Sequence, residues 1–297
     1  FLRKLFLLYI TIIWKIYFMS NKLLKLKFWG TRGSNPSAAQ NMSTYGGETT
    51  CVELRSSNND LVIFDMGTGI IRLGNSIVNE PSPVKNFHIL LSHFHWDHII
   101  GFASFKPVYI KGFNITIYAQ KPENGSLKEV FQDMLNNRYW PVPLDKLGAN
   151  ITFREVHPLI FKINDDIAVE ARYHPHPGGA LGYRLLVDGK KITFITDIEH
   201  PPEGTLESVI ELARDSDILI HEGHFSPEDL PKHTGWGHSS WVEAVDVAKK
   251  SESKRLIMNH HSPEYEDTQI AVLEANAKRE FPNSSFSRSE ETIFLNL

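Results

Sequence analysis

The sequence of 297 residues predicts an α/β protein in which two β-sheets pack face to face and helices cover the outer faces. The chain divides into two halves, and each half places short apolar strands before its helices. Several apolar runs end in loops that contain histidine or aspartate. Asp188 and Gly189 separate two strand-like runs, residues 182–187 and 191–195, and this dipeptide is a strong signal for a two-residue β-hairpin.

The first half of the chain is expected to consist mainly of strands. Residues 24–28 alternate apolar and basic side chains, which favours an edge strand. Turn-forming residues at 56–60 predict that the runs on either side pair with each other. Residues 138–143 are rich in aromatics and proline, and form either the wall or lid of a pocket or a cover for the sheet edge. The predicted strands are 24–28, 51–54, 61–64, 87–91 and 115–119, and the predicted helix is 127–137.

The second half continues with short strands and then longer helical segments. In the last helical segment, Ile270, Leu273, Ala277 and Phe281 recur at helical spacing and predict a face turned towards the core. The predicted strands are 151–155, 167–171, 182–187, 191–195, 218–221, 256–258 and 293–295, and the predicted helices are 205–215, 239–252 and 268–281.

Composition limits the classes of function. The formal charge of -4 supplies no basic field for a long polyanion, which argues against a long nucleic acid as partner. Cys51 is the only cysteine, so an internal disulfide is excluded and a reducing, cytoplasmic compartment is favoured.

The apolar stretch 1–18 is expected to precede the folded domain, which begins near Leu24. It is short for a membrane span, Lys15 interrupts it, and no small-residue cleavage site follows it. We favour Met19 as the true start, with a membrane anchor as the alternative; contact with a membrane depends on that alternative. Residues 1–23 are therefore expected to be a leader or anchor, and residues 24–297 a single domain, for which a homodimer is left open.

A cluster of histidine and aspartate follows the apolar run 87–91. In an extended segment, the period of two points His93 and His95 the same way. The turn that follows can direct Asp97 and His98 to a second point about 3–4 Å further on, which is the spacing of a two-metal site. Imidazole and carboxylate are the usual ligands of hydrolytic zinc. The alternative is that these are ordinary polar residues at a strand end.

The His-x-His-x-Asp-His form of residues 93–98 resembles the metallo-β-lactamase superfamily, and the similarity extends over nearly everything from Leu24 onward. It implies a four-layer αββα sandwich of two mixed β-sheets. The similarity is to the tRNase Z and phosphodiesterase members, whose register implies His176, Asp197 and His260 as the remaining ligands. A carboxylate such as Asp197 has two oxygens and can bridge two cations.

The resemblance thus implies two divalent metal ions. Zinc is expected from the imidazole content, with Mn²⁺ or Fe²⁺ as alternatives. Asp65 is either a partner of a ligand histidine or part of a simple Asx-turn, and His174 and His261 are not expected to be ligands, His174 being placed beside the site or on the surface. The implied ligands are His93, His95 and His176 for one ion, Asp97, His98 and His260 for the other, and Asp197 as the bridge.

Two later segments resemble catalytic segments of tRNase Z. Residues 219–224 resemble its His-Glu-Ala-Thr segment and residues 237–240 its His-Ser-Thr segment. Carried over, His238 is the general acid and Glu222 its partner. Asp97 is expected, in addition, to orient the attacking hydroxide. Read without the resemblance, Glu222 is a buried hydrogen-bonding acid and His238 a solvated residue at a helix start, with Ser239 as the N-cap.

The sequence departs from tRNase Z in two places. The basic Pro-x-Lys-x-Arg-Asn loop of that family is replaced by residues 35–41, and the long arm between the third-motif histidine and the bridging aspartate is reduced to little more than one hairpin. The expected substrate is therefore a small or cyclic phosphodiester, attacked by a hydroxide that bridges the metal ions. A carboxylic ester, lactone or thioester is the alternative substrate, and a non-catalytic metal-binding scaffold or sensor is the alternative of another class.

Overall fold

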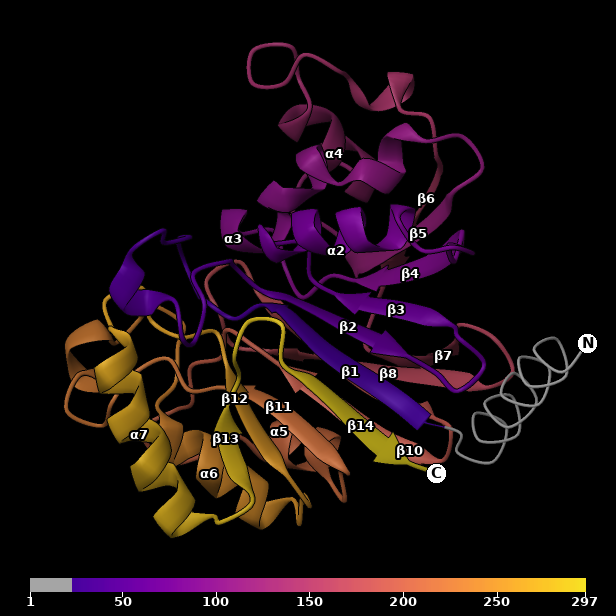
Figure 1. Ribbon diagram of the computed structural model, residues 1–297. Coiled ribbons are helices and arrows are strands. Elements are labelled where there is room, and N and C mark those ends of the chain that lie inside the picture. Colours follow the sequence, from indigo (N-terminus) through magenta and orange to yellow (C-terminus); the bar gives the residue numbers. More distant parts are fainter. Residues whose placement is uncertain (1–22) are drawn as a thin grey trace, which may run out of the picture.

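The computed structural model describes residues 23–297 (Figure 1). The stretch 1–18, for which the sequence favours a leader or an anchor, lies outside the described residues. Between residues 23 and 297, no helix has both the length and the apolar character that crossing a bilayer requires.

Two seven-stranded sheets form the centre of the molecule, and both are mixed. The first has the strand order β14-β1-β2-β3-β4-β5-β6, antiparallel from β14 to β3 and parallel from β3 to β6. Its strands are β1 (Leu23–Gly30), β2 (Cys51–Arg55), β3 (Leu61–Phe64), β4 (Asn86–Leu90), β5 (Asn114–Gln120), β6 (Asn150–Val156) and β14 (Thr292–Asn296).

The second sheet has the order β13-β12-β11-β10-β9-β8-β7. It is antiparallel from β7 to β10 and parallel from β10 to β13. Its strands are β7 (Leu159–Lys162), β8 (Ile167–His174), β9 (Ala180–Val187), β10 (Lys190–Ile195), β11 (Ile218–Glu222), β12 (Leu256–Asn259) and β13 (Ser284–Phe286).

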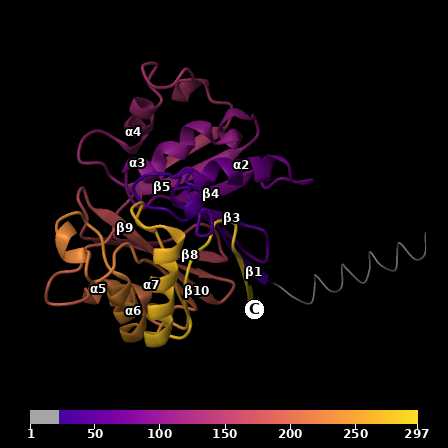
Figure 2. The same cartoon turned by 60° about the vertical axis from the view of Figure 1, so that its left-hand side comes forward.

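Helices cover the outer face of each sheet, so that the molecule has four layers (Figures 1 and 2). The predicted αββα arrangement of two mixed sheets is therefore confirmed. The first sheet carries α2 (Gly69–Val78), α3 (Trp96–Ile99) and α4 (Leu127–Met134), and the second carries α5 (Glu207–Ala213), α6 (Trp241–Lys250) and α7 (Asp267–Glu280).

The buried apolar side chains form three clusters, one in each space between neighbouring layers. The period of two in the strands explains the division. In β3, Leu61 and Ile63 pack towards the helices of the first sheet, whereas Val62 and Phe64 pack between the sheets, where the Phe64 ring stacks on Phe194 of β10. The predicted stripe of α7 also faces its cluster, with Ile270 and Ala277 fully buried.

Most predicted elements are present, and the hairpin at Asp188 and Gly189 is confirmed. Both turn residues have positive φ, 52° and 72°, as a type I′ turn requires. The edge position predicted for residues 24–28 is wrong, because β14 returns from the C-terminal end of the chain and pairs with β1 on its open side. The helix predicted at 127–137 ends earlier, at Met134.

Among the α-helices and strands of residues 23–297, four were not predicted: α2, the single-turn α3, β7 and β13. The sequence of α2 contains Gly69, Gly74 and Asn75, which have low helix propensity, and Thr68 makes no side-chain cap. Its buried face of Ile70, Leu73 and Ile77 packs on the first sheet, so tertiary contacts stabilise this helix against its local preference. The strands β7 and β13 lie at the two edges of the second sheet and are short.

Candidate metal centre

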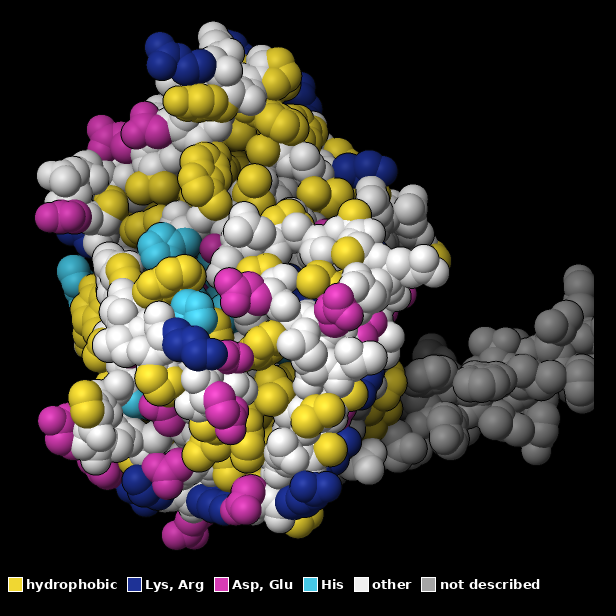
Figure 3. Space-filling view, turned by 90° about the vertical axis from the view of Figure 1, so that its left-hand side faces the viewer, with side chains coloured by type: hydrophobic (Ala, Val, Ile, Leu, Met, Phe, Trp, Pro, Cys, Tyr) yellow, Lys and Arg dark blue, Asp and Glu magenta, His cyan; other side chains and the backbone are white. Residues whose placement is uncertain are grey.

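Loops at the ends of strands from both sheets meet at one place between the two halves of the sandwich. His93 follows β4, Asp197 follows β10 and His260 follows β12, while His176 lies in the short connection from β8 to β9. Parallel strands place their carboxyl ends at the same edge of a sheet, and the binding sites of such sheets lie there. On the face shown in Figure 3, histidine side chains gather beside hydrophobic ones.

The seven predicted ligands come together in two groups. His93, His95 and His176 form the first, and the ring atoms His95 Nδ1 and His176 Nε2 are 3.0 Å apart. The second group is Asp97, His98, Asp197 and His260, and its members are buried. His95 is exposed, so solvent reaches the first group from its side.

Asp197 lies between the groups and presents one oxygen to each. Its Oδ1 is 3.9 Å from Nε2 of His93 and from Nε2 of His176. Its Oδ2 is 3.2 Å from Nε2 of His98 and 3.3 Å from Nε2 of His260. This is the arrangement of a carboxylate that can bridge two cations.

The backbone at the site is strained at three non-glycine residues. Asp65, Asp197 and His260 have φ of 59°, 56° and 60°, and each lies one or two residues beyond the end of a strand. A left-handed conformation costs a non-glycine residue about 1–2 kcal/mol, and such strain concentrates at functional sites. The strands thus end in sharp turns that aim these three side chains at the site.

Hydrogen bonds fix which ring nitrogen of each histidine faces the site. Nδ1 of His98 donates to Asp65 Oδ2 at 2.7 Å, and Nδ1 of His93 donates to Ser92 Oγ, which itself donates to Asp65 Oδ2. Nδ1 of His176 donates to the carbonyl of Gly237 at 2.8 Å. In all three rings Nε2 is therefore the nitrogen that is directed at the site, as in metal centres whose ligands are oriented by acceptors behind them. Of the two interpretations of Asp65, the contacts favour the partner of a ligand histidine.

The electrostatics of the two groups fit a pair of cations. Burial lowers the pKa of His93, His95 and His176, so these rings are neutral and each can offer a nitrogen lone pair to a metal ion. The buried Nε2 of His93 has no hydrogen-bond partner. In the second group, burial also disfavours the charged rings, yet the carboxylates outweigh it and raise the pKa of His260 to about 10. A cation bound by the second group would take the place of the protons that its carboxylates otherwise stabilise on its histidine rings.

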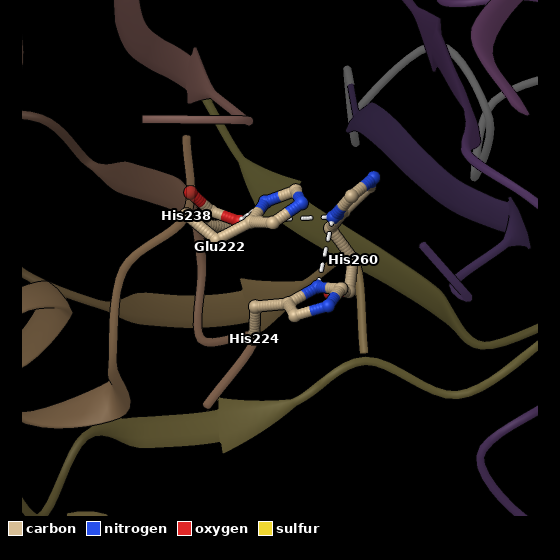
Figure 4. A group of neighbouring side chains, drawn as sticks. All are labelled: Glu222, His224, His238 and His260. Atoms are coloured by element: carbon tan, nitrogen blue, oxygen red, sulfur yellow. Dashed lines mark hydrogen bonds and ion pairs between the residues drawn. The ribbon is translucent and has the colours of Figure 1, made fainter. Parts of the chain in front are cut away.

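Next to the second group lies a cluster of Glu222, His224, His238 and His260 (Figure 4). Glu222 is fully buried at the end of β11, where its Oε1 accepts the backbone N–H of Ile198 at 2.6 Å. Its Oε2 accepts from Nδ1 of His238 at 3.0 Å, and it lies 3.7 Å from Nδ1 of His260. One carboxylate thus contacts both the predicted general acid and a predicted metal ligand.

The charge on Glu222 sets the protonation of His238. Burial alone would lower the pKa of His238, but the carboxylates of Glu222 and Asp197 outweigh burial and raise it. The structure therefore places Glu222 in contact with His238, as the resemblance implies, and favours the protonated ring near neutral pH. The helix N-cap predicted at Ser239 is wrong by one residue: Ser240 caps α6 in a capping box with Glu243, while the backbone N–H of Ser239 donates to Glu222.

His224 was missed as a member of this site. Its ring stacks on that of His238, with centroids 4.1 Å apart and planes 6° apart, and its Nδ1 donates to the carbonyl of His260 at 2.8 Å. It occupies the position of the threonine in the His-Glu-Ala-Thr segment, so a histidine at that place was the available signal.

The two histidines set aside as ligands are buried. His174, expected beside the site or on the surface, is not on the surface: its Nε2 donates to the carbonyl of Thr196, immediately before Asp197. His261 donates from Nε2 to the carbonyl of Ser287 and lies in neither ligand group.

Gly237 packs directly against His176 of the first group. A β-carbon there would lie 2.2 Å from Nδ1 of His176, whereas one at Gly235 would meet nothing within 4 Å. Both glycines have φ near +87° and donate to Glu199, so alanine should destabilise the fold by about 1–2 kcal/mol at either position. We expect only Gly237→Ala to displace His176 and to weaken metal binding, by roughly 10–100-fold. Metal titration and thermal unfolding of both variants check this; equal metal affinity would contradict the packing argument.

Comparisons with known proteins agree with this geometry. The Beta-lactamase superfamily domain matches residues 62–261, which is more than half of the chain. A curated relative, ribonuclease Z of Streptococcus thermophilus, is 25% identical over 322 aligned positions that cover 91% of this chain and 99% of the relative. The metallo-β-lactamase fold protein YhfI of Bacillus subtilis superimposes with a TM-score of 0.70 at 16% identity, covering 92% of this chain and all of that one. The short form of human tRNase Z superimposes with a TM-score of 0.66 at 19% identity, covering 91% and 98%.

The four-layer fold, with histidine and aspartate groups at the ends of its strands, defines a metal-dependent hydrolase. The chain belongs to the metallo-β-lactamase superfamily, and the family membership expected from residues 93–98 is confirmed.

Proposed function

We propose that this protein is a phosphodiesterase with two divalent metal ions, most simply zinc, held within a single domain formed by residues 24–297. His93, His95 and His176 would hold one ion, Asp97, His98 and His260 would hold the other, and Asp197 would serve both. The observation that carries the proposal is the placement of Asp197, with one carboxylate oxygen turned to each group. When bound, two such cations supply Lewis acidity towards phosphoryl oxygens and a nucleophile from water at neutral pH.

The residues of the chain supply the remaining steps. Asp97, whose Oδ2 accepts the backbone N–H of Ser34 at 2.8 Å, is held where it orients the attacking water. His238 donates a proton from its free Nε2 to the leaving alkoxide, because its Nδ1 is occupied by Glu222. The phosphodiester and water thereby give a phosphomonoester and an alcohol.

A small or cyclic phosphodiester is the substrate we propose first. The connection from His176 to Asp197 consists of β9, β10 and the turn at Asp188 and Gly189, so nothing in it extends towards a long RNA. An RNA is the second candidate, because curated relatives are named ribonuclease Z.

A substrate panel at fixed metal concentration tests the proposal. We expect turnover of bis(4-nitrophenyl) phosphate and of a cyclic nucleotide, and slower turnover of a tRNA precursor, a lactone and a thioester. Cleavage of the lactone or thioester without any diester would refute the phosphodiesterase assignment, and tight metal retention without turnover of any compound would favour a non-catalytic scaffold or sensor.

Metal removal gives a readout that is independent of turnover. Because cations bind only the folded centre, adding Zn²⁺ at about 1,000 times its Kd to the chelator-stripped protein should stabilise the fold by about 4 kcal/mol. Thermal unfolding with and without metal checks this, with Mn²⁺ and Fe²⁺ as comparisons. An unchanged melting temperature would mean that the centre does not bind cations in the folded state.

A further inference from the structure

A pocket of about 800 Å³ opens beside the metal centre, and His176 and His238 form part of its lining. Five prolines and two leucines supply much of the remainder, including Pro175, Pro201, Leu206 and Leu230. Proline fixes its own φ, so a wall built from prolines loses little conformational freedom when a ligand is bound. The pocket is thus a preformed apolar space next to the predicted general acid.

Acidic side chains line the pocket without any lysine or arginine to balance them. Its lining includes Glu199 and Glu243 and no lysine or arginine. Glu199 already accepts the backbone N–H groups of Gly235 and Gly237, and Glu243 accepts from Ser240 in the cap of α6. Both carboxylates therefore hold the protein backbone in place, and an anion that entered beyond His238 would meet these acidic groups and no lysine or arginine.

We propose that this pocket receives the leaving group of the substrate, and that this group is an uncharged, mainly apolar alcohol. The proposal rests on the phosphodiesterase function above, since His238 both lines the pocket and lies 3.7 Å from the bridging Asp197. As water attacks phosphorus and the P–O bond to the leaving group breaks, the proton of His238 passes to the alkoxide oxygen and the neutral alcohol remains in the apolar space. A nucleic acid chain is disfavoured on this side, because a further phosphate that entered the pocket would be repelled by Glu199 and Glu243.

Three methyl phosphodiesters with different leaving alcohols test the proposal: 2-cyclohexylethanol, choline and 3-hydroxypropanoate. With release of methyl phosphate followed by ³¹P NMR, we expect kcat/KM for the cyclohexylethyl ester to exceed that of both charged esters at least about tenfold. Equal or greater activity on the choline or the carboxylate ester would overturn the proposal.

Leu230→Arg is the informative variant, because Leu230 lines the pocket and belongs to none of the three apolar clusters. It should lower kcat/KM for the cyclohexylethyl ester about tenfold or more and raise it for the carboxylate ester. Leu186→Arg, at an exposed leucine of β9 outside the pocket, is the matched control and should change neither.

Direct binding gives a second readout. Saturation-transfer NMR with free 2-cyclohexylethanol and metal-depleted protein should detect binding to the wild type and to Leu186→Arg, and none to Leu230→Arg. If the wild type cleaves bis(4-nitrophenyl) phosphate but shows no preference among the three esters, the pocket proposal fails and the phosphodiesterase function stands. If no diester is cleaved at all, both fail.

Discussion

Replacing Asp197 with alanine is expected to release metal from both groups and to lower phosphodiester turnover by at least roughly 10²–10³-fold. Each of its two oxygens faces one group, so their loss removes the carboxylate that both groups share and the acidic side chain nearest to His93 and His176. Metal content by mass spectrometry, together with the rate on bis(4-nitrophenyl) phosphate, checks this.

Asp215→Ala is the matched control for this variant. Asp215 also has a left-handed backbone, with φ of 55° against 56° at Asp197, but it lies on the surface beside Lys191. Both alanines therefore carry similar backbone strain, and only the variant at Asp197 should lose metal. Two metal ions per chain in Asp197→Ala would rule out the bridging role.

His238→Ala is expected to retain its metal and to slow the cleavage of an alkyl phosphodiester by about 10²–10⁴-fold, the usual contribution of a general acid. The loss should be smaller for 4-nitrophenyl esters, whose leaving group needs little protonation. His233→Ala, in the neighbouring 3₁₀-helix (Leu230–His233), is the control. Equal losses on alkyl and nitrophenyl esters would contradict proton donation by His238.

The pH dependence of this step follows from the raised pKa of His238. General-acid activity requires the protonated ring, so it is present below that pKa and declines as the pH rises through it. Glu222→Gln removes the carboxylate that raises the pKa, and the alkaline decline should therefore begin at a lower pH. An alkaline limb that is identical in wild type and Glu222→Gln would show that the ring is not the group titrated.

Much of the architecture could be predicted because its signals are local. The alternation of side chains in β3 assigns Leu61 and Val62 to opposite faces, and the turn at Asp188 and Gly189 requires residues that tolerate positive φ. Residues 93–98 likewise place four metal-binding side chains within six consecutive positions. In each case the partners lie within a few residues of each other, so the pattern is visible in the sequence.

Other features depend on contacts between distant segments. Residues 24–28 carry no local signal for their pairing with β14. The two strands lie at opposite ends of the described chain, so only the folded structure brings them together. His224 became part of the site only when β11 and β12 paired and brought its ring to His260 and His238. Local sequence could not assign its role, since an isolated histidine after a buried strand has many uses.

The sequence by itself determined the fold class, the order of the strands along the chain and the chemical character of the site, because side-chain periodicity and ligand type are properties of short segments. Only the tertiary structure decided that Asp197 divides its two oxygens between the groups, and that a proline-walled pocket opens beside His238. The orientation of Asp197 and the pocket both depend on the relative positions of segments that are far apart in the chain. The packing of the two sheets against each other sets those positions.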